Sequence, residues 1–167
     1  MFEEIIAALV RADVRFVVIG GVAATIQGSA RFTNDIDICY DTAPDNVERL
    51  VKLLAGWNAY LRGVEQGLPF VMDSKAFRIT PVMTLTTDVG DIDVLDVVRG
   101  VGDFAAVLEA SEIVEIGDVE FRSLELDALI ASKRALGRPK DVEQLIELEA
   151  LRALRRRGVD QEREAES

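Results

Sequence analysis

Two pairs of aspartates have the spacing that places both members of a pair on one face of a β-strand. Asp35 pairs with Asp37 and Asp91 with Asp93, and a single isoleucine separates the members of each pair. Side chains alternate between the faces of a strand, so each pair presents its carboxylates together while the isoleucine turns to the core. Adjacent carboxylates repel one another unless a cation lies between them. If the two strands are neighbours, the pattern predicts a divalent metal site.

Other uses of this spacing are a solvent-exposed strand that binds nothing and the calcium-binding loop of an EF-hand. The EF-hand is unsuitable because Cys39 and Tyr40 stand where that loop needs an oxygen ligand and a glycine. Two aspartate pairs with a glycine pair upstream favour the metal site over the bare strand. Three carboxylates suffice to hold two Mg²⁺ ions roughly 4 Å apart.

The glycine pair is Gly20 and Gly21, which close the apolar run Phe16–Ile19. Because glycine has no Cβ, backbone N–H groups at such a turn can approach phosphate oxygens, and a following helix N-terminus adds favourable partial charge. The chain has no Gly-Lys-Ser/Thr of a Walker loop and no Gly-x-Gly-x-x-Gly of a dinucleotide site. The pair therefore indicates phosphate binding of another kind.

Composition removes several classes of chemistry. The chain has 167 residues, one cysteine and no histidine. The absence of histidine excludes Ser-His-Asp catalysis, Cys-His catalysis and histidine-ligated zinc, which leaves carboxylates as the chemical groups of a site. A net charge of -11 argues against broad nonspecific binding to nucleic acid. No segment approaches the apolar length of a membrane span, the N-terminus is acidic, and the lone Cys39 fits a reducing compartment. We expect a cytoplasmic protein without a membrane partner.

The elements that must position these residues follow from periodicity and from turn residues. Helices are expected at 2–12, 22–28, 44–56, 124–136 and 139–157, an extended segment at 68–72, and strands at 15–19, 35–40, 82–87, 91–95, 112–116 and 118–122. The strands at 82–87 and 91–95 and those at 112–116 and 118–122 are expected to form hairpins. The pattern predicts an α+β fold, a small mixed β-sheet with flanking helices and a C-terminal helical pair.

This organisation predicts one domain. Residues 1–123 would form the catalytic core, residues 124–157 the C-terminal helices packed on the same domain, and residues 158–167 a disordered polar tail.

Basic residues gather late in the chain. Lys133 falls on the apolar stripe of its helix, so it either points inward to an anion or buries its stem and extends its ammonium group to solvent. Asp141, in the first turn of the next helix, suits the helix dipole. The run Arg155 to Arg157 is typical of solvated helix surface, and Cys39 of a small packing residue.

These motifs in this order resemble the signature of the polymerase-beta-type nucleotidyltransferase superfamily, in which a glycine pair precedes Asp-x-Asp. The matching segments are Val18 to Gly21 and Arg31 to Ile38. The Arg-x-Thr-x-Asp-x-Asp form, together with Lys133 and the run Arg138 to Asp141, is similar to the AbiEii and minimal nucleotidyltransferase group of bacterial toxin-antitoxin systems. The resemblance spans approximately residues 15–145.

The resemblance implies that Asp35 and Asp37 bind two Mg²⁺ ions. The third acid of the family, which also binds metal and activates the acceptor hydroxyl, would be Asp93, with Asp91 as the alternative. All three acids would then be catalytic residues.

The resemblance also implies a set of nucleotide contacts. Gly20 and Gly21 would hold the triphosphate of the NTP, and Lys133 would contact its phosphates. Asp141 would lie near the nucleotide, and Arg31 would neutralise charge on the leaving pyrophosphate.

The implied activity is transfer of a nucleoside monophosphate from an NTP to an acceptor hydroxyl, in a toxin-antitoxin system. The acceptor is a partner protein, which the acidity of the chain favours, or tRNA, for which the basic residues between Lys133 and Arg157 leave room. One alternative is a catalytically silent module of the same fold that neutralises a partner protein, and another is a purely structural acidic domain. The presence of all three acids counts against the silent module.

Overall fold

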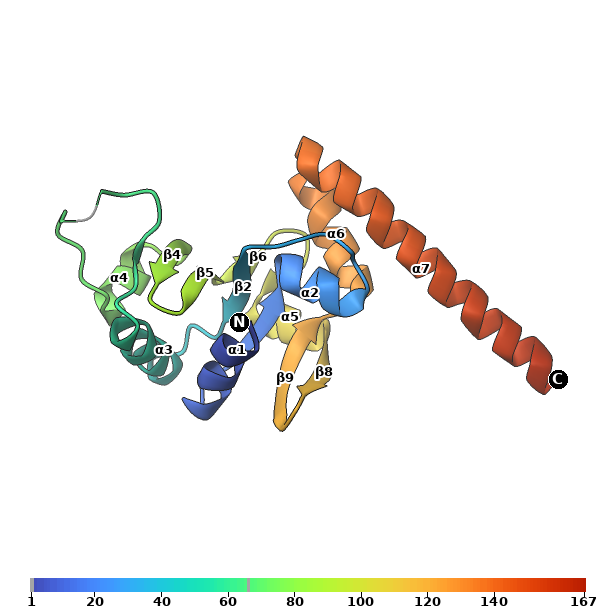
Figure 1. Cartoon of the computed structure of the whole chain (residues 1–167), viewed down its shortest axis with the longest axis horizontal. Coiled ribbons are helices and arrows are strands. Elements are labelled where there is room, and N and C mark those ends of the chain that lie inside the picture. The colour runs from blue at the N-terminus through green and yellow to red at the C-terminus, as the bar shows by residue number, and fades with distance from the viewer. Residues whose placement is uncertain (1, 66) are drawn as a thin grey trace.

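A mixed β-sheet runs through the protein and carries both aspartate pairs near its centre (Figure 1). The structure is a computed structural model that describes residues 2–65 and 67–167. Within those residues the sheet has seven strands in the order β3-β4-β5-β2-β1-β9-β8. The strands are β1 (Phe16–Ile19), β2 (Asp35–Tyr40), β3 (Tyr60–Leu61), β4 (Met83–Thr87), β5 (Gly90–Leu95), β8 (Ser111–Ile116) and β9 (Val119–Leu124).

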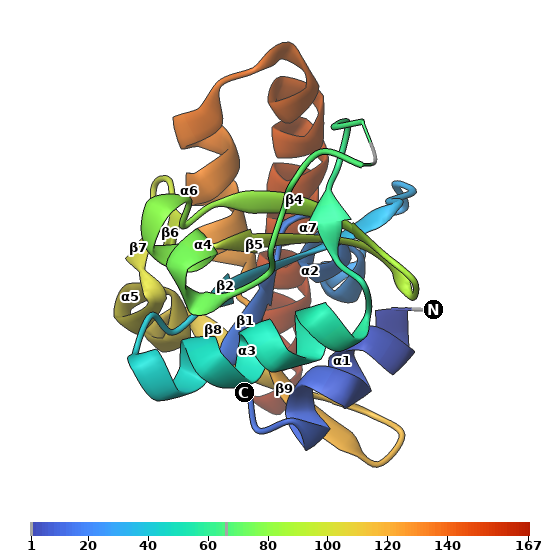
Figure 2. The same ribbon diagram turned by 90° about the vertical axis from the view of Figure 1, so that its left-hand side faces the viewer.

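Helices cover the sheet and extend beyond it. They are α1 (Phe2–Arg11), α2 (Gly20–Gln27), α3 (Pro44–Gly56), α4 (Ser74–Ile79), α5 (Phe104–Glu109), α6 (Leu126–Leu136) and α7 (Pro139–Glu166), and a small hairpin pairs β6 (Val97–Val98) with β7 (Gly102–Asp103). Figure 2 shows α1 and α3 on one side of the central strands and α6 on the other. Among the described helices, none combines the length and the apolar character that crossing a membrane requires.

The central strands are buried on the face opposite the aspartates. Ile36 and Ile92 are at most 1% exposed, as the alternation in each aspartate pair predicts. Every residue of β1 is buried, which matches a strand covered on both faces. β2 pairs antiparallel with β1 and parallel with β5. Strands distant in sequence therefore become neighbours at the centre of the sheet.

Most predicted elements are present. The α+β fold, its mixed sheet and the C-terminal helical pair are confirmed, and both predicted hairpins form as β4 with β5 and β8 with β9. Gly137 ends α6 in the left-handed conformation (φ 63) and Pro139 begins α7, as the sequence indicates. Two helix starts differ by two residues, because α2 begins at Gly20 rather than at residue 22 and α6 at Leu126 rather than at residue 124.

The sequence prediction missed the two-residue strands β3, β6 and β7 and the six-residue helices α4 and α5. Two residues show no strand alternation, and six residues span less than two helical turns, so neither length displays a period. Conversely, the extended segment expected at 68–72 joins no sheet and forms irregular chain before α4.

The C-terminal segment also differs from the prediction. Residues 158–166 continue α7 instead of forming a disordered tail, although every side chain from 158 to 167 is exposed. A single glycine, Gly158, costs a helix only about 1 kcal/mol, and the runs Arg155 to Arg157 and Gln161 to Ala165 on either side are good helix formers. The predicted boundary between the catalytic core and the C-terminal helices, after residue 123, lies between the last two residues of β9.

Candidate functional site

Asp35, Asp37 and Asp93 meet at the centre of the sheet. The parallel register of β2 and β5 sets Asp37 opposite Asp93, and one carboxylate oxygen from each of the three acids lies within 4.8 Å of the others. The three side chains are partly exposed and line a cavity of about 450 Å³. Asp91 stands opposite Asp35 in the register and accepts a hydrogen bond from Thr86 Oγ1 at 2.9 Å, outside this cluster.

The acids oppose one another's ionisation. Burial, helped by the charges of Asp93 and Asp35, raises the pKa of Asp37 to about 7. Burial also raises the pKa of Asp93. The positive charge of Lys133 lowers the pKa of Asp37, but not enough to offset burial. Carboxylates whose pKa values are raised because they are buried close together are typical of a site that binds a cation.

The two glycines pack directly against the aspartate strand. Gly20 has a φ of +62, and a Cβ there would lie 2.0 Å from Asp37 Oδ2. A Cβ on Gly21 would lie 2.8 Å from Thr33 Oγ1, and this hydroxyl donates to the backbone oxygen of Asp35 at 3.0 Å. Both glycines also line the cavity, at the first turn of α2. The glycine pair therefore makes room for the carboxylates as well as for a ligand.

The donor set fits a hard divalent cation such as Mg²⁺. Carboxylate oxygens are the ligands that Mg²⁺ prefers, and three converge within reach of one ion. The missing Cβ at Gly20 leaves the Asp37 carboxylate free to take its place in the set. Asp35, Asp37 and Asp93 would hold the metal.

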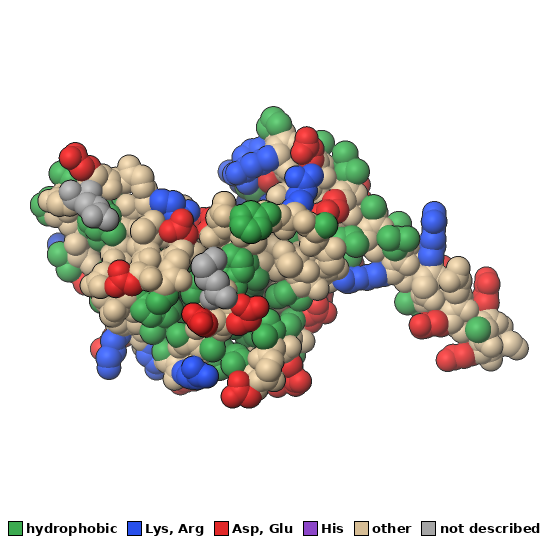
Figure 3. All heavy atoms as spheres, in the orientation of Figure 1, with side chains coloured by type: hydrophobic (Ala, Val, Ile, Leu, Met, Phe, Trp, Pro, Cys, Tyr) green, Lys and Arg blue, Asp and Glu red, His purple; other side chains and the backbone are tan. Residues whose placement is uncertain are grey.

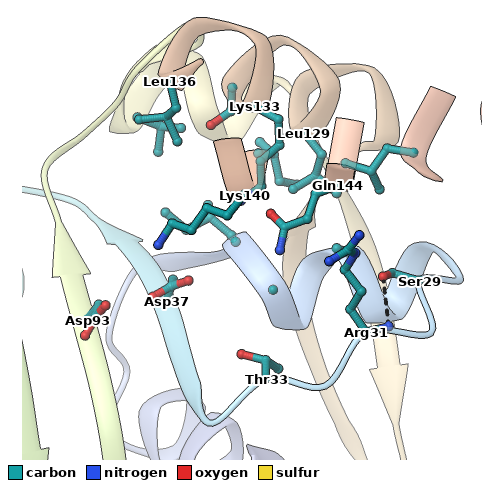
Figure 4. Close-up of a pocket in the computed structure, with 18 of the residues that line it drawn as sticks. Ser29, Arg31, Thr33, Asp37, Asp93, Leu129, Lys133, Leu136, Lys140 and Gln144 are labelled. Carbon is teal, nitrogen blue, oxygen red and sulfur yellow. Dashed lines mark hydrogen bonds between the residues drawn. The ribbon is translucent and has the colours of Figure 1, made fainter. Parts of the chain in front are cut away.

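Basic and polar side chains face these acids across the cavity. Figure 4 shows Lys133, Lys140 and Gln144 on the helical wall, with Asp37 and Asp93 on one side and Arg31 on the other. The Lys133 side chain is only 13% exposed, and its Nζ lies 3.5 Å from Asp141 Oδ1. Lys133 therefore points inward, toward an anion. An acidic floor beneath basic walls can receive a metal together with a polyanion.

Arg31 lines the cavity from the loop between α2 and β2. Its guanidinium is held by α7, with Nη2 at 3.5 Å from Glu143 Oε2 and Nε at 3.9 Å from Glu147 Oε1. The Arg31 backbone N–H donates to Ser29 Oγ at 3.2 Å, the dashed line in Figure 4. Arg31 can therefore contact a ligand in the cavity, although its guanidinium already interacts with Glu143 and Glu147 of α7.

Asp141 is the predicted site residue that lies apart from the cavity lining. Its side chain is fully buried and accepts from Arg138 Nε at 2.6 Å and from the Arg138 backbone N–H at 3.2 Å. The hydrogen bond from Arg138 lowers the pKa of Asp141. This carboxylate fastens the junction of α6 and α7, and a direct nucleotide contact remains a prediction.

Comparison with known families points the same way as this geometry. Over residues 1–167 the sequence matches the family model described as "nucleotidyl transferase of unknown function (DUF2204)". The chain belongs to this family. Membership in DUF2204 confirms the nucleotidyltransferase part of the resemblance, and the partly exposed acid cluster agrees with it. Among proteins of curated function, none matches the sequence.

The fold of this DUF2204 protein is similar to that of a solved crystal structure. It is a crystal structure of a Thermotoga maritima protein described provisionally as a nucleotidyltransferase. The two chains superpose with a TM-score of 0.57 at 18% sequence identity, over 87% of this chain and 88% of the other. At this identity the match supports the fold, which is that of a nucleotidyltransferase.

Arg62 is a residue of the DUF2204 site that sequence reasoning missed. It follows the short strand β3, and its guanidinium lies 3.5 Å from Asp35 Oδ2, 3.3 Å from Asp91 Oδ2 and 2.8 Å from Asp93 Oδ1. Its sequence neighbours, Leu61 and Gly63, form no recognisable motif. Only the pairing of β3 with β4 brings Arg62 to the acids.

Proposed function

We propose that this protein is a metal-dependent nucleotidyltransferase that moves a nucleoside monophosphate from an NTP to an acceptor hydroxyl. The observation that carries the proposal is the convergence of Asp35, Asp37 and Asp93 within 4.8 Å, at the edge of a cavity with basic walls. Family membership and fold support nucleotidyl transfer in general. The requirement for NTP and Mg²⁺ is part of the proposal.

Each residue has a defined task in this reaction. Asp35, Asp37 and Asp93 would hold the metal, and Mg²⁺ bound there would supply positive charge to the phosphate oxygens of the substrate. Asp93 is also the base that accepts the proton of the acceptor hydroxyl. The hydroxyl oxygen then attacks the α-phosphorus in line, and pyrophosphate leaves.

The cavity walls hold the triphosphate. Gly20 and Gly21 let the substrate approach the backbone, because neither carries a Cβ. Lys133 and Lys140 supply positive charge from α6 and α7, and Arg31 supplies it from the opposite side. Removal of one such contact is expected to raise KM more than it lowers kcat.

For the acceptor we favour a hydroxyl of a partner protein, within an AbiEii-like toxin-antitoxin pair. The net charge of -11 opposes the docking of a large polyanion such as tRNA. Several of the basic residues between Lys133 and Arg157 already form ion pairs, including Arg134 with Glu149 and Arg152 with Asp127. Arg155 donates to Gln27 at 2.7 Å. These interactions leave fewer of the basic side chains for contacts with tRNA phosphates.

The test is nucleotide transfer by the wild type and by two matched substitutions. The protein is incubated with labelled NTPs, Mg²⁺ and either total cell protein or total tRNA. Asp37→Asn is expected to lower transfer at least 100-fold, because one metal ligand and its charge are lost. Asp91→Asn, two residues from Asp93 but outside the cluster, is expected to retain most of the activity. Transfer by Asp37→Asn at the wild-type rate would refute the mechanism, and labelled tRNA without labelled protein would overturn the choice of acceptor.

A further inference from the structure

Arg62 already occupies a cation position beside the acid cluster. One guanidinium contacts Asp35, Asp91 and Asp93, and its closest carboxylate contact is 2.8 Å, to Asp93 Oδ1. Arg62 is only 30% exposed and Asp93 only 19%, so solvent screens this contact less than it would a surface ion pair.

The arginine is held in place by more than the acids. Its backbone N–H donates to the Thr84 carbonyl at 2.9 Å, and Nη2 donates to the Leu85 carbonyl at 2.8 Å. These two bonds tie Arg62 to β4, the strand beside β5. The position is therefore built into the sheet, and a long flexible side chain can still withdraw from it.

We propose that Arg62 is an intrinsic counter-cation of the acid cluster, which a divalent metal has to displace or push aside in order to bind. This inference rests on the metal site of the proposed function. Arg62 contacts one oxygen each of Asp35 and Asp93, two of the three carboxylates that would hold the metal, and two cations in one small site repel each other. Arg62 stabilises the metal-free protein and at the same time lowers its affinity for metal.

The experiment is a calorimetric titration with Mn²⁺ at pH 8, with thermal unfolding of the same samples. Arg62→Gln is expected to bind Mn²⁺ roughly tenfold more tightly than the wild type and to have a lower Tm without metal. Saturating Mn²⁺ should narrow that difference in Tm. Arg62→Lys keeps the charge but loses the forked geometry, so its Mn²⁺ affinity and its metal-free Tm should lie between those of the wild type and of Arg62→Gln.

Arg49→Gln is the matched control, because Arg49 pairs with Asp45 on α3 and is no part of the cluster. It should leave Mn²⁺ affinity unchanged. Equal or weaker Mn²⁺ binding by both Arg62 variants would overturn the role of Arg62 and leave the metal site standing. Failure of the wild type and of every variant to bind Mn²⁺ would overturn the inference and the proposed function together.

A separate observation concerns α7, which projects away from the body of the protein (Figure 1). Leu148 faces inward and is buried, whereas Ile146 and Leu154 are 65% and 63% exposed. Ala150, which lies between them, is also exposed. Residues three or four positions apart share a helix face, so these three form an apolar stripe on the outer side of α7.

The charges at the two ends of this stripe are complementary. Glu143 precedes Ile146 by three positions, and Arg157 follows Leu154 by three. The Glu143 side chain contacts Arg31 of its own chain at 3.5 Å but is 73% exposed, so it is accessible to a second partner. If a second α7 packs antiparallel with the two copies of Ala150 at the crossing, Ile146 of one copy meets Leu154 of the other. Glu143 then meets Arg157 at both ends. A parallel arrangement would instead set like charges against each other.

We infer that this face binds α7 of a second copy of the chain in antiparallel orientation. The small Ala150 at the centre allows close approach of the two helices. Figure 3 shows the C-terminal end of α7 extending beyond the body of the protein. An interface of one helix pair is small, so association should appear at high protein concentration.

Sedimentation equilibrium over a range of concentrations tests this inference. Arg157→Glu is expected to weaken the wild-type dimer at least tenfold, and the double variant Glu143→Arg with Arg157→Glu should restore it. Arg163→Glu makes the same charge change off this face and should have no effect. A wild type that stays monomeric throughout, or a double variant that dissociates like the single one, would overturn the inference.

Discussion

At the scale of single residues, the site depends on how little space separates its groups. Gly20 adopts a φ of +62 with its α-carbon beside the Asp37 carboxylate, so a methyl group there would collide with Oδ2. Burial, helped by the like charges of Asp93 and Asp35, raises the pKa of Asp37 to about 7. The close approach of Gly20 and the clustering of the carboxylates together form a negatively charged site for a metal ion.

Gly20→Ala should therefore damage both stability and metal binding. The left-handed backbone alone costs a residue with a Cβ about 1–2 kcal/mol, and displacement of Asp37 adds to this. Urea unfolding and Mn²⁺ titration measure the two effects. Gly56→Ala is the control, because no atom lies within 4 Å of the added methyl group. A Gly20→Ala variant with wild-type metal affinity would show that Asp37 is not held as described.

The raised pKa of Asp37 predicts a pH dependence of the metal-free protein. Its folded pKa is about 7 and the unfolded value about 3.9, so the folded state binds the extra proton between these values. Stability should fall as pH rises from about 4 to 7 and then level off. Asp37→Asn should lose this part of the slope in thermal unfolding. A wild type and an Asp37→Asn variant with parallel pH profiles would contradict the prediction.

At the scale of elements, the helical pair is fastened to the site by one buried carboxylate. Asp141 joins Arg138 at the start of α7 to Lys133 near the end of α6. Lys133 thereby stays aimed at the cavity. The helix junction and the basic wall of the site are one structure.

Asp141→Ala is expected to destabilise the protein by about 2–3 kcal/mol, because the helix loses its cap and Lys133 loses its buried partner. Asp127→Asn is the comparison, since the exposed ion pair of Asp127 with Arg152 should contribute less than about 1 kcal/mol. Urea unfolding gives both values. Equal effects of the two substitutions would refute the fastening role of Asp141.

At the scale of the whole molecule, the body ends before α7 does. Leu148 packs in the core and Arg155 donates to Gln27, whereas every side chain from 158 onward is exposed. The last turns of α7 therefore add helix without adding core.

Deletion of residues 158–167 should leave the Tm unchanged and should remove helical signal in circular dichroism. Intact nucleotide transfer by the truncated chain would accompany this result. A marked fall in Tm would mean that the segment packs against the body in solution.

The sequence by itself determined what depends on local patterns. Strand alternation predicted that Asp35 and Asp37 share a face, and Gly137 with Pro139 marked the break between the last two helices. These features follow from backbone geometry over a few residues, which a sequence displays directly. Together with the resemblance, they indicated a nucleotidyltransferase, and they indicated Asp35 and Asp37 as two acids of one site with Asp93 or Asp91 as the third.

Only the tertiary structure decided which distant residues meet. The parallel register of β2 and β5 brings both aspartates of β5 beside those of β2, and of these two only the Asp93 side chain joins the cluster. The short strand β3 carries Arg62 to the same place. A two-residue strand and a pairing between strands far apart in the chain leave no periodic signal. The positions of Asp93 and Arg62 are set by the packing of the whole sheet. Once they are neighbours, the carboxylate and the guanidinium attract each other whatever their separation in the sequence.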